Sequence, residues 1–168
     1  MITAVDVNYR DNGSARAAAV VFEHFSDAVP YSAYTADIPQ VEAYIPGQFF
    51  RRELPCIIAV LEIIREAVSI IIVDGYVMLG DRPGLGFHVW QQVRQEKAVI
   101  GVAKSPYTDS NALTVIRGSG KNPLYVTSVG IEPAIAAGWV RRMEGKYRIP
   151  TLLKYADSLS KRTVKRDD

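Results

Sequence analysis

Four carboxylates stand where a solvated surface does not explain them: Asp6, Glu53, Asp74 and Asp157. Asp6 lies inside an alternating apolar stretch and Asp74 ends the apolar run IIIVD, while Glu53 and Asp157 fall in segments with helical patterning. A carboxylate within an apolar strand carries a desolvation penalty unless something compensates it. A divalent cation such as Mg²⁺ compensates well, since it takes hard oxygen ligands, and one or two such ions can activate water for phosphodiester cleavage.

Each acid also has an ordinary explanation when it is taken alone. Glu53 can cap a helix, and Asp74 can begin a turn. If the strands of Asp6 and Asp74 lie side by side, the two carboxylates become neighbours, and the start of a helix can bring Glu53 to the same edge. Sequence spacing leaves both alternatives open.

The segment after Asp74, VDGYVMLGDRPGLG, contains four glycines and raises the alternative of a phosphate-binding loop. A Walker-type loop ends in Gly-Lys-Ser/Thr. This segment lacks that ending, and no lysine lies between Arg65 and Lys97. Asp74, rather than the glycines, is therefore the residue expected to carry chemistry here.

The elements that must position these residues follow from hydrophobic patterning. Alternation or continuous apolar runs predict strands at 2–9, 17–25, 28–37, 69–74, 97–104, 112–118 and 123–130. Apolar residues at helical spacing predict helices at 53–68, 84–95, 132–145 and 151–162, with Pro55 in the first turn of its helix. Three strands followed by alternating helices and strands indicate the α/β class, with a mixed central β-sheet and helices on both faces.

Length and composition bound the rest. The 168 residues fit one domain, 1–168. The single cysteine, Cys56, excludes an internal disulfide, and neither a signal peptide nor an apolar run long enough to span a membrane is evident. We expect a cytoplasmic protein with no membrane association and no obligate protein partner.

The charge of the chain permits nucleic-acid binding without requiring it, because the net charge is +2. The clearest basic run is the tail KRTVKRDD, from about residue 161. This tail predicts a solvated, fraying end, with contact to a phosphate backbone as the alternative.

Five motifs in order resemble those of the endonuclease V family, deoxyinosine-directed endonucleases with a ribonuclease H-like fold. AVDVNY resembles the family's D-V-x-Y strand, and AYIPGQFFRRELP resembles its Y-I-P-G-x-x-x-x-R-E-x-P motif, the most specific of the five. IIIVDG, VIGVAKS and the pair YRIP and ADSLSKR match the remaining motifs, so that the resemblance covers roughly residues 2–162.

The resemblance implies roles for the charged residues. Asp6, Glu53 and Asp74 match the acidic metal-binding triad, and Asp157 falls where the family carries a further acid or histidine beside the metal. Lys104 matches a lysine near the scissile phosphate, where it would act as a point charge. The implied cofactor is Mg²⁺, with Mn²⁺ as a possible substitute.

The resemblance also implies a nucleic-acid-binding set. Tyr44, Ile45 and Pro46 match a wedge that separates strands at the lesion, since apolar wedges unstack bases. An ordinary Pro/Gly loop is the alternative explanation for this segment. The complete implied set is Tyr44, Ile45, Pro46, Gly47, Arg52, Gly75, Arg82 and Gly101.

The chain departs from the family after Asp74. Tyr76 stands for the first histidine of the motif and Gly80-Asp81 for its His-Pro, while Arg82 and His88 correspond to a retained arginine and histidine. The family's S-P-G-H motif is altered to SVGI at 128–131. The predicted function is metal-dependent hydrolysis of a phosphodiester near deoxyinosine or inosine in DNA or RNA. The alternatives are a weak or inactive nucleic-acid-binding protein and a nuclease for mismatched or branched DNA.

Overall fold

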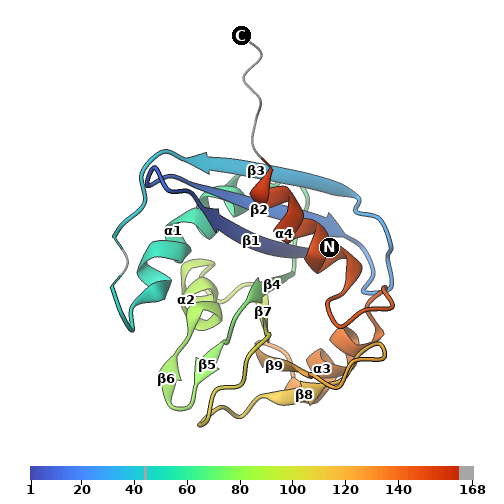
Figure 1. Cartoon of the computed structure of the whole chain (residues 1–168). Helices are drawn as coiled ribbons and strands as arrows, with labels where there is room; N and C mark the ends of the chain where they lie inside the picture. Colours follow the sequence, from blue (N-terminus) through green and yellow to red (C-terminus); the bar gives the residue numbers. More distant parts are fainter. Residues whose placement is uncertain (44, 163–168) are drawn as a thin grey trace.

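The computed structural model describes residues 1–43 and 45–162, so that Tyr44 and most of the predicted basic tail lie outside the described residues. Seven strands form one sheet in the order β3-β2-β1-β4-β7-β9-β8 (Figure 1). The strands of this sheet are β1 Ile2–Tyr9, β2 Ala15–Phe22, β3 Ser32–Ile38, β4 Ile70–Asp74, β7 Ala98–Ala103, β8 Leu113–Val115 and β9 Leu124–Val129. The helices are α1 Phe49–Glu62, α2 Leu85–Gln92, α3 Pro133–Arg142 and α4 Thr151–Lys161.

The sheet is mixed, as predicted. β1 pairs antiparallel with β2 and parallel with β4, and β4 pairs parallel with β7. β9 is antiparallel to both β7 and β8. The parallel centre places the carboxyl ends of β1, β4 and β7 at one edge, where the predicted chemistry is concentrated.

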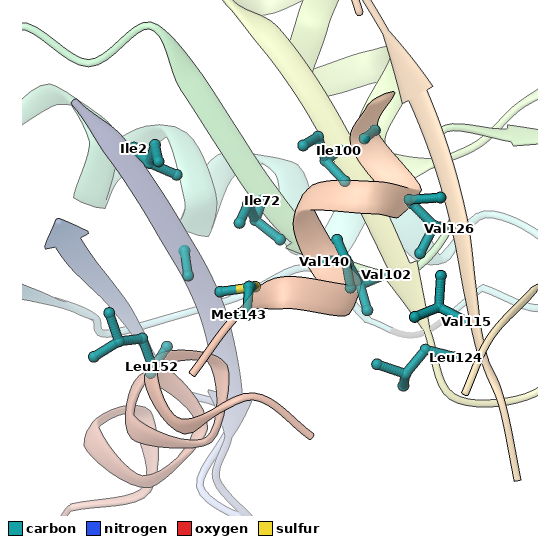
Figure 2. Packing of buried hydrophobic residues seen from close by; sticks show 14 of the residues in the cluster. Ile2, Ile72, Ile100, Val102, Val115, Leu124, Val126, Val140, Met143 and Leu152 are labelled. Atoms are coloured by element: carbon teal, nitrogen blue, oxygen red, sulfur yellow. The ribbon is translucent and has the colours of Figure 1, made fainter. Parts of the chain in front are cut away.

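Helices cover both faces of the sheet, which confirms the predicted layers. α1 and α2 pack on one face with Val5, Ile71 and Val99, and α3 and α4 pack on the other with Ile72 and Ile100. Strand side chains alternate between the two faces, so each central strand contributes to both cores. Figure 2 shows the second core, with residues of α3 and α4 packed against the strands.

The predicted start of α1 is wrong by one turn. The helix begins at Phe49 rather than at Glu53, and it ends at Glu62 rather than continuing to 68. Pro55 therefore lies inside the helix, not in its first turn, and its missing N–H leaves the Arg51 carbonyl without a helical donor. Glu53 is thus part of the helix body and does not cap it.

A short hairpin and a hydrogen bond between distant segments complete the fold. A short hairpin that the sequence did not predict, β5 Met78–Leu79 with β6 Arg82–Pro83, follows β4. Among the described residues, no helix is long and apolar enough to cross a membrane. At the end of α4, the Arg162 carbonyl accepts a 2.6 Å hydrogen bond from Arg16.

Candidate active site

Asp6 and Asp74 lie on adjacent strands, as predicted. The parallel register ends with Val5 opposite Val73, and Asp6 and Asp74 follow at the ends of these adjacent strands. Because side chains alternate along a strand, Asp6 and Asp74 share the sheet face that α4 covers. Two carboxylates from segments far apart in the chain are therefore held at one strand edge.

Lys104 lies at the end of β7, beside this pair. Its Nζ donates a 2.5 Å hydrogen bond to the Asp74 carboxylate. Burial lowers the pKa of Lys104, but the hydrogen bond and charge of Asp74 outweigh burial, so the pKa is raised overall. Lys104 consequently keeps its positive charge at neutral pH, next to the carboxylates.

Asp6 is held by the last helix. The hydroxyl of Ser160, a fully buried residue of α4, lies 2.6 Å from Asp6 Oδ2 and donates to it. Burial raises the pKa of the Asp6 carboxyl, the bond from Ser160 lowers it, and the charges of Asp157 and Asp74 raise it further. The pKa of Asp6 is raised overall, so its surroundings do not fully compensate the negative charge of the ionised carboxylate.

Sequence reasoning missed Ser160. The available signal was its place on the apolar side of α4, three residues after Asp157, where a serine needs a polar partner. Asp157 itself lies on the same helix and pairs with Lys161 at 2.6 Å. Its charge acts on Asp6 and Lys104, so Asp157 belongs to the same electrostatic cluster.

Glu53 enters the cluster from α1, on the other side of the sheet. It is only 6% exposed, and its Oε2 atom is buried with no hydrogen-bond partner. Burial raises the pKa of Glu53 to about 8, with further contributions from the charges of Asp74 and Asp6. The three residues of the predicted triad are therefore electrostatically coupled.

The donor set fits a hard divalent cation. Carboxylate oxygens are what Mg²⁺ and Mn²⁺ prefer, and the partnerless oxygen of Glu53 together with the raised pKa of Asp6 calls for a compensating positive charge. Across residues 1–43 and 45–162, however, no three His, Cys, Asp or Glu side chains already converge in a metal-binding arrangement. The Asp74 and Asp6 carboxylates instead face Lys104 and Ser160.

Residues of the predicted wedge are exposed. Ile45 is 41% exposed, and Pro46 and Gly47 are also at the surface, in the loop before α1. Gly47 has a φ of 77°, which favours glycine. Tyr44, the remaining wedge residue, lies outside the described residues.

Arg52, one of the two arginines predicted to contact nucleic acid, has a partner within the protein. The Arg52 guanidinium lies 3.9 Å from the centroid of the Tyr9 ring, and its Nε is buried without a hydrogen-bond partner. The Tyr9 hydroxyl is likewise buried and unpartnered, and burial together with the charge of Glu53 raises the pKa of Tyr9. Arg51 is the exposed member of the arginine pair.

Gly75 and Gly101, two of the three glycines in the predicted nucleic-acid-binding set, pack against each other. A Cβ on Gly101 would approach the Gly75 carbonyl oxygen to 2.5 Å and Thr127 Oγ1 to 2.8 Å. Gly75 has a φ of 139°, a conformation that side chains rarely adopt. The backbones at the ends of β4 and β7 therefore pack so closely that residue 101 has no room for a side chain larger than that of glycine.

The altered loop after β4 forms a rim of its own. The Tyr76 hydroxyl donates to the Ser105 carbonyl at 2.7 Å, and Arg82 donates to the Tyr107 hydroxyl at 2.6 Å. The Tyr76 and Tyr107 rings lie 6.1 Å apart. His88 stacks on Phe50 with ring centroids 3.8 Å apart, and burial lowers its pKa.

A cavity of about 490 Å³ lies directly beneath the acids. Asp6, Asp74, Lys104 and Asp157 contribute to its lining, together with apolar residues of the same strands and of α4. The strand edge therefore combines clustered carboxylates, one lysine and an adjoining hollow. Such a combination suits hydrolysis of a phosphate ester.

Comparison with known proteins is consistent with this chemistry. The family model described as Endonuclease V matches residues 1–119. Endonuclease V of Streptomyces avermitilis is 30% identical over 187 residues, covering 98% of this chain and 80% of the relative. Endonuclease V of Nostoc punctiforme is 28% identical, covering 95% of this chain and 81% of the relative.

Solved structures share the fold. The crystal structure of the Streptomyces avermitilis protein has a TM-score of 0.74 at 29% identity, covering 95% of this chain and 78% of that one. Endonuclease V of Ciona intestinalis, in complex with a 24mer DNA containing an inosine followed by a ribo-adenosine, has a TM-score of 0.78 at 20% identity. The alignment covers 95% of this chain and 83% of the Ciona chain.

Proposed function

The chain belongs to the endonuclease V family of nucleases, as its motifs predicted, and we propose that it is a metal-dependent endonuclease that hydrolyses a phosphodiester near deoxyinosine in DNA or inosine in RNA. The observation that carries this proposal is the coupling of three carboxylates at one strand edge. Asp6 and Asp74 lie on adjacent strands, and the charges of both raise the pKa of buried Glu53.

The proposed metal is Mg²⁺, with Mn²⁺ as a substitute, held by Asp6, Glu53 and Asp74 with Asp157 beside them. When bound, such an ion lowers the pKa of water and stabilises charge on phosphate oxygens. The protein's own residues then have distinct tasks. Glu53 and Asp6 supply oxygen ligands whose charge is otherwise under-compensated, and Ser160 fixes the orientation of Asp6.

Lys104 supplies positive charge for the reacting phosphate in this proposal. Its ammonium group is about half exposed and keeps its proton at neutral pH. Released from Asp74, it can donate hydrogen bonds to a phosphate oxygen as negative charge develops there. Arg148 holds the backbone at this point, because its guanidinium donates to the Lys104 carbonyl.

The proposed substrate rests on the wedge loop and on the family. Ile45 and Pro46 are exposed before α1, where apolar side chains could unstack a base. The Ciona relative was crystallised with inosine-containing DNA. We also propose a cytoplasmic location, which the single unpaired cysteine supports.

The test is a cleavage panel of inosine-, uracil- and mismatch-containing single and double strands, with Mg²⁺, Mn²⁺ or EDTA. We expect nicking of inosine-containing strands that requires the cation. Asp74→Asn should abolish nicking while nucleic-acid binding persists. Full activity of Asp74→Asn would overturn the assignment.

A second candidate is binding without turnover. The tyrosine rim favours it, since Tyr76 stands where the family motif carries a histidine, and the retained Arg82 donates to the hydroxyl of Tyr107, which follows β7. Binding to inosine-containing strands without nicking under any metal condition would support this candidate. Nicking of mismatched or branched DNA alone would support a nuclease with a changed substrate.

A further inference from the structure

Apolar residues that line the cavity lie next to the acids along the same strands. The lining includes an apolar floor of Ala4 on β1, Ile72 on β4 and Val102 on β7. These residues stand two positions before Asp6, Asp74 and Lys104, respectively, and Lys104 directly follows the end of β7. Residues two apart on a strand share a face and lie about 6.6 Å apart. The charged edge and the apolar floor are therefore successive rows of the same three strands.

The walls come from the C-terminal part of the chain. α4 contributes Leu153 and Ala156, and the segment before it contributes Tyr147 and Ile149. α4 packs mainly on β1 and β2, while α3 packs mainly on β8 and β9 (Figure 1). The cavity is lined by residues of the central strands β1, β4 and β7 and of α4. Its volume of about 490 Å³ falls in the usual range for small-molecule pockets.

The cavity is lined by residues other than those of the predicted wedge and of the altered loop after β4. Neither the exposed loop 45–47 nor the segment 75–88 lines it. A base unstacked by that loop and received beside that segment would leave this cavity free for a different part of the substrate.

The mouth of the cavity carries groups suited to a nucleic-acid strand. Tyr147 is 64% exposed, and the ammonium groups of Lys146 and Lys154 lie 5.2 and 5.9 Å from its ring centroid. Lys104, which also lines the cavity, is hydrogen-bonded to the Asp74 carboxylate. Proteins that bind single strands combine cations for the backbone with aromatic and apolar surfaces for the bases.

The wall segment is held in place before any ligand arrives. Arg148 donates to the carbonyl oxygens of Lys104 and Pro123, the latter at 2.7 Å. Buried Arg117 donates to the Tyr147 carbonyl at 3.1 Å and to the Gly145 carbonyl at 3.0 Å. A pocket fixed in this way loses little conformational entropy on binding.

We propose that this cavity binds the base of a nucleotide adjoining the scissile phosphate, as a second base site distinct from lesion recognition. The inference rests on the proposed nuclease function, since it is the reacting phosphate that brings a nucleotide to the charged edge. The base faces are flat and apolar and match the floor, while the phosphate remains with the charged row. Ala4, Ile72 and Val102 offer no side-chain hydrogen bond, so the site accepts any base.

The test separates this site from catalysis by working in EDTA. Protein with isotope-labelled methyl groups is titrated with a short single-stranded DNA and with an abasic strand of the same length and charge. We expect the methyl resonances of Ile149 and Leu153 to shift with the first strand alone. Those of Leu159, a residue of α4 that does not line the cavity, should stay in place.

Filling the cavity supplies the matched variants. Leu153→Phe should weaken binding of the base-containing strand about tenfold, the scale of one lost base contact, and leave the abasic strand unaffected. Leu159→Phe on the same helix should bind as the wild type does. Ile149→Phe, in the segment before α4, should weaken binding of the base-containing strand in the same way. It provides the test if Leu153→Phe fails to fold.

Equal binding of both strands by the wild type, or an unchanged preference in both filled variants, would overturn the base site. Failure to cleave with metal bears only on the proposed function. If the expected methyl shifts are observed and the protein does not cleave with metal, the base site is supported and the proposed nuclease function is refuted.

Discussion

The Ser160 hydroxyl donates a 2.6 Å hydrogen bond to the Asp6 carboxylate, across 154 residues of sequence. The bond ties the last helix to the first strand at the point where the acids gather. It also lowers the pKa of Asp6, against the burial that raises it. Ser160 therefore both positions a proposed metal ligand and favours the ionised form in which it can bind a cation.

Ser160→Ala should reduce stability and change the pH dependence of activity. A hydrogen bond to a charged group contributes about 1.5–3 kcal/mol, and we expect a loss of that size in the free energy of unfolding at pH 7. Without the bond the pKa of Asp6 rises further, so the acidic limb of the pH–activity profile should move to higher pH. Denaturant titration and pH–rate measurements test both effects. Ser158→Ala is the control, because the Ser158 hydroxyl is exposed and donates to the Lys154 carbonyl; equal effects of the two substitutions would contradict this role.

Glu53 should make the metal-free protein less stable as the pH rises. Its folded-state pKa of about 8 lies above the ordinary value of 4.5. The stability linked to its protonation is fully present below pH 4.5 and is lost as the pH rises through about 8. In EDTA, the free energy of unfolding of the wild type should fall between pH 4.5 and 8.5. The fall should be roughly 3–5 kcal/mol smaller for Glu53→Gln, which has no carboxyl group to ionise at this position. Unfolding free energies at the two pH values measure this difference.

Metal addition distinguishes a ligand from a merely buried acid. Mg²⁺ at pH 8.5 should restore stability to the wild type and much less to Glu53→Gln, since the substitution removes an oxygen charge that the ion compensates. Glu62→Gln, at an exposed position of the same helix, should behave as the wild type. Equal stabilisation of all three proteins would argue against Glu53 as a ligand.

Lys104→Met should impair turnover far more than folding. The loss of one charge that stabilises the transition state lowers kcat by about 10²–10³. The ion pair with Asp74 is about half exposed, so unfolding free energy should change by no more than about 1 kcal/mol. Single-turnover cleavage rates and denaturant titration provide the two readouts. Lys121→Met, at an exposed site outside the cluster, should leave both unchanged.

Arg117 should be needed for the geometry of the segment that walls the cavity. Its buried guanidinium donates to the carbonyls of Met143, Gly145 and Tyr147. Lysine cannot reproduce this planar fork, and buried carbonyls that lose their donor cost about 1–3 kcal/mol. We expect Arg117→Lys to lower the unfolding free energy by about 3 kcal/mol. Arg141→Lys, at an exposed position, should have an effect within about 0.5 kcal/mol.

The sequence predicted the parts that depend on local pattern. Alternation and apolar runs located the strands that end in Asp6 and Asp74, and their parallel pairing then brought the two acids together. The start of α1 was misplaced because Pro55 suggested a first turn, whereas the helix tolerates it one turn later. Ser160 and Arg117 were missed for a different reason. Their partners lie 154 and 26 residues away in sequence, and the local pattern that marks a buried serine or arginine does not identify such a distant partner.

The tyrosine rim gives the last prediction, on substrate choice. Tyr76 stands where the family motif carries a histidine, and its hydroxyl donates to the Ser105 carbonyl at 2.7 Å. If this contact closes the rim over the site, Tyr76→His should open it and restore an imidazole hydrogen-bonding group. We expect the ratio of kcat/KM for inosine-containing over mismatched strands to rise about tenfold, the worth of one hydrogen bond. Tyr76→Phe, which keeps the ring and loses only the hydroxyl, separates the two causes. A higher ratio for both variants would assign the effect to opening of the rim. A higher ratio for Tyr76→His alone would assign it to recognition by the imidazole. An unchanged ratio in both variants would exclude Tyr76 from substrate choice.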